Sequence, residues 1–106
     1  MFGLGPKVPE ILPADVEKNM QGPTPPYILV VRTVGEFRSG HIPGAQLIPL
    51  GELGRRHAEL PKDRMIITVC RSGSRSQMAA RQLVKLGYDV HNMTGGMIRW
   101  RGRTVR

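Results

Sequence analysis

The sequence is poor in cysteine, in aromatic residues and in acidic residues. Its 106 residues include a single cysteine, Cys70, which excludes a disulfide within the chain and a Cys-x-x-Cys pair. It also excludes a thiolate cluster for zinc or iron–sulfur, and we predict neither a metal site nor a cofactor. Cysteine usage of this kind is typical of a reducing compartment, so we expect a cytoplasmic location.

Long apolar runs are missing as well. No stretch approaches the ~20 residues that a membrane-spanning helix needs. The segment from Met1 to Lys7 lacks the basic-then-apolar layout of a signal peptide. We therefore expect no association with membranes. The apolar content of 40% is spread along the chain, which predicts one domain with a core over about 11–100 and terminal extensions at 1–10 and 101–106.

Acidic residues are outnumbered by basic ones, 8 to 16, which gives a formal net charge of +8. A basic surface attracts nucleic acid or small anions. The five aromatic residues form no basic motif of the RNA-binding type, which argues against nucleic acid as a partner. Part of the excess is a tail, because four arginines fall in the last eight residues: Arg99, Arg101, Arg103 and Arg106.

Strand and helix patterns alternate along the chain. The runs 27–31 and 65–69 are apolar and rich in β-branched residues, which is typical of strands buried on both faces. Short strands are predicted at 8–11, 45–49 and 89–93, and helices at 13–20, around 36–37, at 52–60, at 76–86 and at 95–100. This alternation predicts an α/β domain with a mainly parallel sheet.

The candidate site lies where two of these strands end. Ligand sites of parallel sheets lie beyond the carboxyl ends of the strands, where both Cys70 and Arg32 are placed. A thiolate is the reactive form of cysteine. Backbone N–H groups of the loop after Cys70 and the positive end of the next helix favour that anion. A cysteine that only fills core space is the competing interpretation.

The loop after Cys70 supplies further groups that suit an anion. Arg71 and Arg75 place two cations close by in sequence. Gly73 permits a tight bend, and Ser72 and Ser74 offer hydroxyl donors.

Three segments together resemble the rhodanese-like sulfurtransferases in their single-domain form. They are the loop 70–75 (CRSGSR), the segments 31–37 (VRTVGEF) and 40–45 (GHIPGA), and 95–100 (GGMIRW). The similarity runs from about Ile11 to Trp100. It implies a three-layer α/β/α sandwich with a central, five-stranded parallel sheet.

The resemblance also implies a mechanism. Cys70 would take sulfane sulfur from a small anionic donor such as thiosulfate, polysulfide or a persulfide. It would hold that sulfur as a persulfide and pass it to cyanide or to a thiol, including a protein thiol. The active-site loop of the family corresponds here to Arg71, Ser72, Gly73, Ser74 and Arg75.

The residues leave several alternatives open. Because the chain has no second cysteine, the sulfur acceptor must come from outside the chain. Cysteine-dependent phosphatases and arsenate reductases have five residues between cysteine and arginine, whereas four residues separate Cys70 from Arg75. This shorter spacing favours sulfur transfer over the alternative of a phosphatase or arsenate reductase.

The role of Arg32 has two alternatives: it either lines the pocket or pairs with Glu36. The sequence does not determine the oligomeric state.

Val30 departs from the family pattern, which usually has an aspartate at this position. We expect this strand end to lie close to the cysteine loop, so that the change removes a negative neighbour of the thiolate. The same change would equally remove a residue that orders the loop or handles protons, which leaves open a second hypothesis, in which the domain is a non-catalytic binding or sulfur-carrier module.

Overall fold

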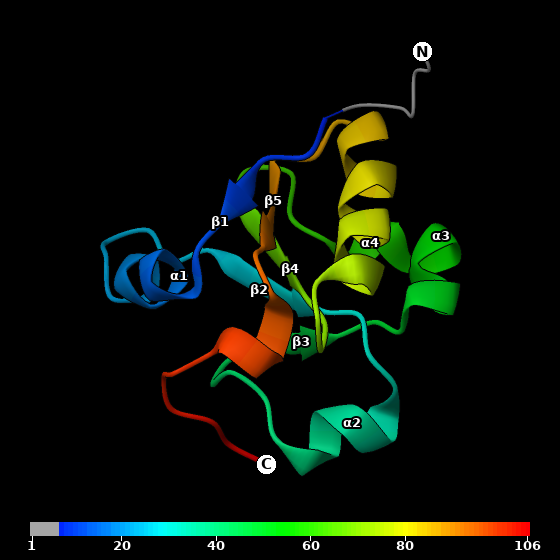
Figure 1. Ribbon diagram of the computed structural model, residues 1–106. Coiled ribbons are helices and arrows are strands. Elements are labelled where there is room, and N and C mark those ends of the chain that lie inside the picture. Colours follow the sequence, from blue (N-terminus) through cyan, green and yellow to red (C-terminus); the bar gives the residue numbers. More distant parts are fainter. Residues whose placement is uncertain (1–6) are drawn as a thin grey trace.

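The computed structural model describes residues 7–106, and its centre is a five-stranded parallel sheet in the order β1-β5-β4-β2-β3 (Figure 1). The strands are β1 (Glu10–Ile11), β2 (Tyr27–Val30), β3 (Gln46–Leu47), β4 (Ile66–Val69) and β5 (Val90–Met93). The α-helices are α1 (Pro13–Met20), α2 (Val34–Ser39), α3 (Leu53–Arg56) and α4 (Ser74–Lys85). Short 3-10 turns cover Leu50–Glu52, His57–Glu59 and Gly96–Arg99.

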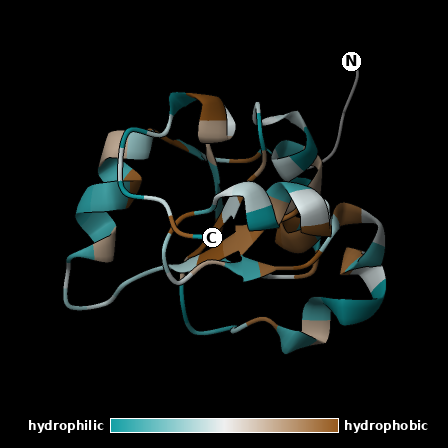
Figure 2. Ribbon diagram, turned by 90° about the horizontal axis from the view of Figure 1, so that it is seen from below, coloured by the Kyte–Doolittle hydropathy of each residue, from teal (hydrophilic) through white to brown (hydrophobic). Residues whose placement is uncertain are grey.

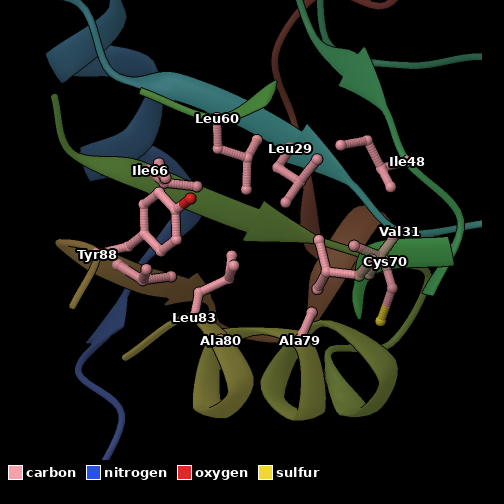
Figure 3. Close-up of a cluster of buried hydrophobic side chains, with 12 residues drawn as sticks. Leu29, Val31, Ile48, Leu60, Ile66, Cys70, Ala79, Ala80, Leu83 and Tyr88 are labelled. Carbon is pink, nitrogen blue, oxygen red and sulfur yellow. The ribbon is translucent and has the colours of Figure 1, made fainter. Parts of the chain in front are cut away.

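The two faces of the sheet carry separate cores, which makes the domain three-layered. On one face, Leu29, Ile66 and Cys70 pack against the apolar side of α4 (Figure 3). On the other face, Ile28, Ile67 and Met93 belong to a second cluster, which includes residues of α1 and of the C-terminal segment. The remaining buried members of this cluster are Val16, Val30, Ile42, Ala45, Val69 and Trp100. Figure 2 shows hydrophobic residues concentrated on the strands, whereas the outer helices mix hydrophilic and hydrophobic residues. The predicted three-layer α/β/α architecture is confirmed.

Several element boundaries differ from the prediction. The region 52–60 is a short helix between two 3-10 turns, because Gly51 and Gly54 weaken its helix propensity. Helix α4 begins at Ser74 rather than at residue 76, since Gly73 turns the chain directly into the helix with φ 102°. The segment 95–100 forms a 3-10 turn.

The two predicted extensions differ in what the structure describes. The first six residues of the N-terminal extension lie outside the described residues. They include most of the segment from Met1 to Lys7, for which we predict no signal peptide. The C-terminal one runs back over the domain, where His41 and Val105 exchange backbone hydrogen bonds of 2.9 Å in each direction. None of the helices in residues 7–106 has the length and apolarity needed to span a bilayer.

The Val30 side chain lies on the face opposite Cys70. Val30 is in register with Val69, and successive strand residues point to opposite faces, so Cys70 points away from Val30. Val30 is buried with Ile42 and Ala45, whereas Cys70 is buried among the residues that pack on α4. The expectation that this position directly neighbours the thiolate is therefore wrong: the strand ends do lie together, but their side chains alternate.

Val30→Asp should lower the free energy of unfolding by about 2 kcal/mol or more, because it buries a carboxyl group among apolar side chains. It should leave the pKa of Cys70 unchanged. Urea denaturation and the pH dependence of thiol alkylation measure the two effects. Val34→Asp, at a residue that is 48% exposed, is the control and should cost less than about 0.5 kcal/mol. A Val30→Asp protein with wild-type stability would contradict this account.

Candidate active site

Cys70 lies at the end of β4, beneath the first turn of α4. The residue is 1% exposed, and its sulfur lies in the core on the α4 face (Figure 3). Its backbone carbonyl accepts a 2.8 Å hydrogen bond from the Met97 N–H, which ties it to the 3-10 turn after β5. Cys70 is therefore held on both its side-chain and its backbone side.

Two hydrogen bonds converge on the sulfur of Cys70. The Gly73 N–H donates to it at 3.0 Å, and the Ser76 hydroxyl donates at 3.4 Å. Burial raises the pKa of the Cys70 thiol. The Ser76 hydroxyl and the backbone N–H groups of Ser76, Gly73 and Ser72 outweigh burial, and the pKa is lowered overall. The expectation of a loop that stabilises a thiolate agrees with this geometry.

The loop geometry depends on two glycines at close approaches. Gly73 has φ 102°, and a Cβ there would lie 3.3 Å from the Gly95 nitrogen. Gly96 has φ 64°, and a Cβ there would lie 2.5 Å from the carbonyl oxygens of Cys70 and Arg71. Side chains at either position would push the loop away from the turn that supports it.

Arg75 points to α2 rather than to the sulfur. Its guanidinium donates two hydrogen bonds to the Glu36 carboxylate, both 3.0 Å long. These bonds, with the Thr33 N–H, lower the pKa of Glu36 to about 2. The Glu36 carboxylate raises the pKa of Arg75, and the charge of Cys70 adds to this to a lesser extent. Arg75 thus connects α4 to α2 and acts on the thiolate from a distance.

The other predicted loop residues take different positions. The side chain of Arg71 is exposed. The hydroxyls of Ser72 and Ser74 lie 3.3 Å from each other, so Ser72 acts on the sulfur through its backbone N–H and not through its hydroxyl. The predicted loop residues are together, but their side chains do not all face Cys70.

Arg32 is a buried partner of Glu36. Its Nη2 lies 3.9 Å from the Glu36 carboxylate, and its side chain is 10% exposed. Its Nε is buried and has no hydrogen-bond partner among the described residues. Of the two alternatives left open by the sequence, pairing with Glu36 is the one with a contact in the structure.

Two polar residues at the site were missed from the sequence, Ser76 and Asn92. Both are buried, Ser76 completely and Asn92 to 2% exposure. Asn92 donates from Nδ2 to the carbonyl of Gly73 at 3.3 Å and to Glu10 at 3.1 Å. Its Oδ1 accepts a 3.2 Å bond from Thr68. A polar residue in an apolar strand was the available signal for Asn92, and a serine in the first turn after the loop was the signal for Ser76.

Comparison with known proteins assigns the family. The model of the rhodanese-like domain matches residues 12–103. The chain belongs to the rhodanese-like family. The match covers the whole sheet apart from β1 and includes the cysteine loop of this rhodanese-like domain.

Relatives of this rhodanese-like domain include proteins named for sulfur transfer. YrkF of Bacillus subtilis, which its name describes as a candidate sulfur carrier, is 40% identical over 92% of this chain and 53% of its own length. A sulfurtransferase of Allochromatium vinosum is 42% identical over 66% of each chain. The thiosulfate sulfurtransferase GlpE of Pseudoalteromonas translucida is 37% identical over 66% of this chain and 68% of its own length. The rhodanese-like domain thus spans about half of YrkF and about two thirds of the other two.

Solved structures share the fold of this domain. A rhodanese-related protein of Thermoplasma volcanium superposes with a TM-score of 0.86 at 28% identity, over 92% of this chain and 97% of its own. A rhodanese-like domain protein of Staphylococcus aureus has a TM-score of 0.84 at 30% identity, over 88% of this chain and 91% of its own. The family and the fold are therefore established together.

Ser76→Ala should raise the pKa of the Cys70 thiol by about one unit, because the thiolate loses a hydroxyl donor. The pH dependence of alkylation by iodoacetamide measures this pKa. Ser72→Ala is the matched control, since the Ser72 hydroxyl contacts Ser74 and not the sulfur. An unchanged thiol pKa in Ser76→Ala, or an equal rise in both variants, would contradict the assignment.

Proposed function

We propose that the protein is a sulfurtransferase that carries sulfane sulfur on Cys70. The observation that carries the proposal is a buried sulfur held by the Gly73 N–H at 3.0 Å and the Ser76 hydroxyl at 3.4 Å. These donors favour a thiolate, which is the nucleophile that sulfur transfer needs. The names of relatives such as GlpE support the same activity.

The transfer has two steps. With thiosulfate as donor, the Cys70 thiolate attacks the sulfane sulfur, the S–S bond of thiosulfate breaks and sulfite leaves with the electron pair. Cys70 then carries a persulfide anion. In the second step, a thiolate or cyanide attacks the terminal sulfur, the new bond forms, and Cys70 leaves as a thiolate. The net change is the movement of one sulfur atom, and no proton or electron is left unbalanced.

The donors around Cys70 suit both anions of this cycle. The backbone N–H groups of the loop are fixed in place before the reaction, so stabilising charge at the sulfur requires little rearrangement. The loop 71–75 is the proposed cradle, with Gly73 as its direct donor and Arg75 holding α4 against α2. An external acceptor thiol must be reduced, which agrees with the expected cytoplasmic location.

Stoichiometric carriage of sulfur is the second candidate function. The observation in its favour is the similarity to YrkF, whose name points to a sulfur carrier. A carrier and an enzyme share the Cys70 persulfide and differ in turnover. Repeated conversion of thiosulfate and cyanide to thiocyanate identifies the enzyme, and a single equivalent identifies the carrier.

Incubation with thiosulfate should add the mass of one sulfur atom to the protein, and cyanide should remove it. Intact-protein mass spectrometry measures the gain. Cys70→Ser should abolish it while circular dichroism shows an unchanged fold. The proposal fails if neither thiosulfate nor polysulfide loads the wild-type protein.

A further inference from the structure

Part of the positive charge within residues 7–106 is paired with carboxylates, and part is not. On the side of α3, charges are balanced: Arg56 forms ion pairs with Glu52 and Glu59. In the cysteine loop and along the C-terminal segment from the 3-10 turn onward, Arg71, Arg99, Arg101 and Arg103 are exposed and form no ion pair within residues 7–106. We call these four arginines the basic face. The carboxylate of Glu36 does not neutralise it, because Arg75 occupies both of its oxygens.

The basic face is continuous with the cysteine loop. The Ile98 N–H donates to the Arg71 carbonyl at 3.0 Å, so the 3-10 turn Gly96–Arg99 lies directly against the loop. In Figure 1 this orange turn lies between the loop and α1. Arg99 and Arg101 then line a cavity of about 340 Å³ whose apolar part is Leu12, Pro13 and Ala14.

Apolar side chains accompany these arginines. Ile98 is 56% exposed and Leu12 is 58% exposed. A second cavity, of about 240 Å³, contains Arg103 and shares Glu17 with the first. Glu17 is the one carboxylate that lines either cavity. The surface therefore combines exposed apolar groups with an excess of arginine.

This combination suits a protein segment better than a small anion or a nucleic acid. A small sulfur donor needs only the donors at Cys70, whereas the basic face extends from Arg71 to Arg103. Single-stranded nucleic acid is held by stacking on exposed aromatic rings, and no aromatic residue within 7–106 is exposed. Apolar anchors with arginines are typical of protein interfaces.

We propose that the basic face, with Leu12 and Ile98, docks the sulfur acceptor, a protein whose thiol lies beside an acidic segment with an apolar side chain. This proposal rests on the sulfurtransferase function and names the class of its acceptor. Charge complementarity brings the acceptor to the face, and the apolar side chain enters the cavity beside Leu12.

The test uses a peptide with one cysteine, several glutamates and one leucine, and a second peptide in which glutamines replace the glutamates. Cys70 is first loaded with sulfur from polysulfide. Transfer to the acidic peptide, compared at equal thiolate concentration, should be about tenfold faster at low salt. The advantage should shrink as salt rises from about 0.05 M to about 0.5 M. Equal rates for the two peptides would overturn the proposal.

Charge-reversed variants locate the effect. Arg99→Glu/Arg101→Glu should remove the advantage of the acidic peptide. Lys7→Glu/Lys85→Glu makes the same change in net charge at exposed positions that line neither cavity and should keep it. Lys85 is a suitable control because it ends the 12-residue helix α4, about 18 Å along the helix axis from the loop. If both double variants lose the rate advantage of the acidic peptide to the same extent, the effect is one of net charge alone and the proposal is overturned.

A binding assay separates this proposal from the sulfurtransferase function. Fluorescence anisotropy measures binding of the acidic peptide with serine in place of its cysteine, so it needs no sulfur transfer. Binding that Arg99→Glu/Arg101→Glu weakens supports the docking surface even if Cys70 takes up no sulfur. Absence of binding, or displacement of the peptide by an equal concentration of single-stranded oligonucleotide, would overturn it.

A separate observation concerns the buried amide of Asn92. The Gly73 carbonyl accepts hydrogen bonds from the Ser76 hydroxyl and the Gln77 N–H, which belong to α4, and from Asn92, which belongs to β5. Asn92 is thus the side chain that attaches Gly73 to the sheet. The Oδ1 of the same amide accepts a 3.2 Å hydrogen bond from Thr68, and Glu10 accepts from its Nδ2.

We infer that Asn92 is a positioning residue that holds Gly73 so that its N–H points at the Cys70 sulfur. Gly73 needs such an anchor because glycine has wide conformational freedom. Asn92 donates to the Gly73 carbonyl and to Glu10 rather than to the sulfur, so it acts through the Gly73 peptide.

Asn92→Thr should raise the pKa of the Cys70 thiol by about half a unit, since the shorter side chain does not reach Gly73. Thr68→Val is the matched control: it removes a buried hydrogen bond to Asn92 and leaves the Gly73 contact intact. Alkylation rates against pH measure the thiol pKa, and urea denaturation measures stability.

Both variants should be less stable than wild type, and only Asn92→Thr should change the thiol pKa. Equal thiol pKa values in the two variants would reduce Asn92 to a structural role. Asn92→Ala provides a second test of the same contact if the threonine variant does not fold. The readout does not require sulfur transfer, so its result is independent of the proposed function.

Discussion

The hydrogen bonds donated to the Cys70 sulfur are the interaction on which the proposed chemistry depends. A sulfur in the core has its charged form disfavoured by burial, so the ionised form exists only where enough donors surround it. The loop provides them by curling its backbone N–H groups and the Ser76 hydroxyl around the sulfur. Burial and reactivity are compatible here because the donors are part of the fold rather than of the solvent.

Contacts from two separate parts of the chain keep this loop in place. The 3-10 turn after β5 supports the carbonyls of Cys70 and Arg71, at a distance that only Gly96 permits. Arg75 ties the first turn of α4 to Glu36 on α2. Each contact comes from a different part of the chain, so the cradle is preorganised by the whole domain.

The sequence predicted the strands, helix α1 and the position of Cys70 well, because these depend on local patterns. The β-branched runs and the strand-to-loop change at Cys70 are visible within about ten residues. It was wrong about Val30, and it missed Ser76 and Asn92. It also placed the side chains of Arg71 and Arg75 at the sulfur, whereas Arg71 is exposed and Arg75 binds Glu36 and acts on Cys70 from a distance. These errors concern side-chain direction and partners, which strand register and packing decide.

By itself, the sequence determined the α/β class and the position of Cys70 at the end of a buried strand, since composition and local periodicity carry that information. Only the tertiary structure decided which groups face the sulfur. Glu36 and Arg75 are 39 residues apart in the sequence, and Asn92 is 19 residues from Gly73. Contacts over such separations depend on how the strands align and which face each residue occupies. The site is therefore a property of the folded sheet and of the loop that the sheet holds.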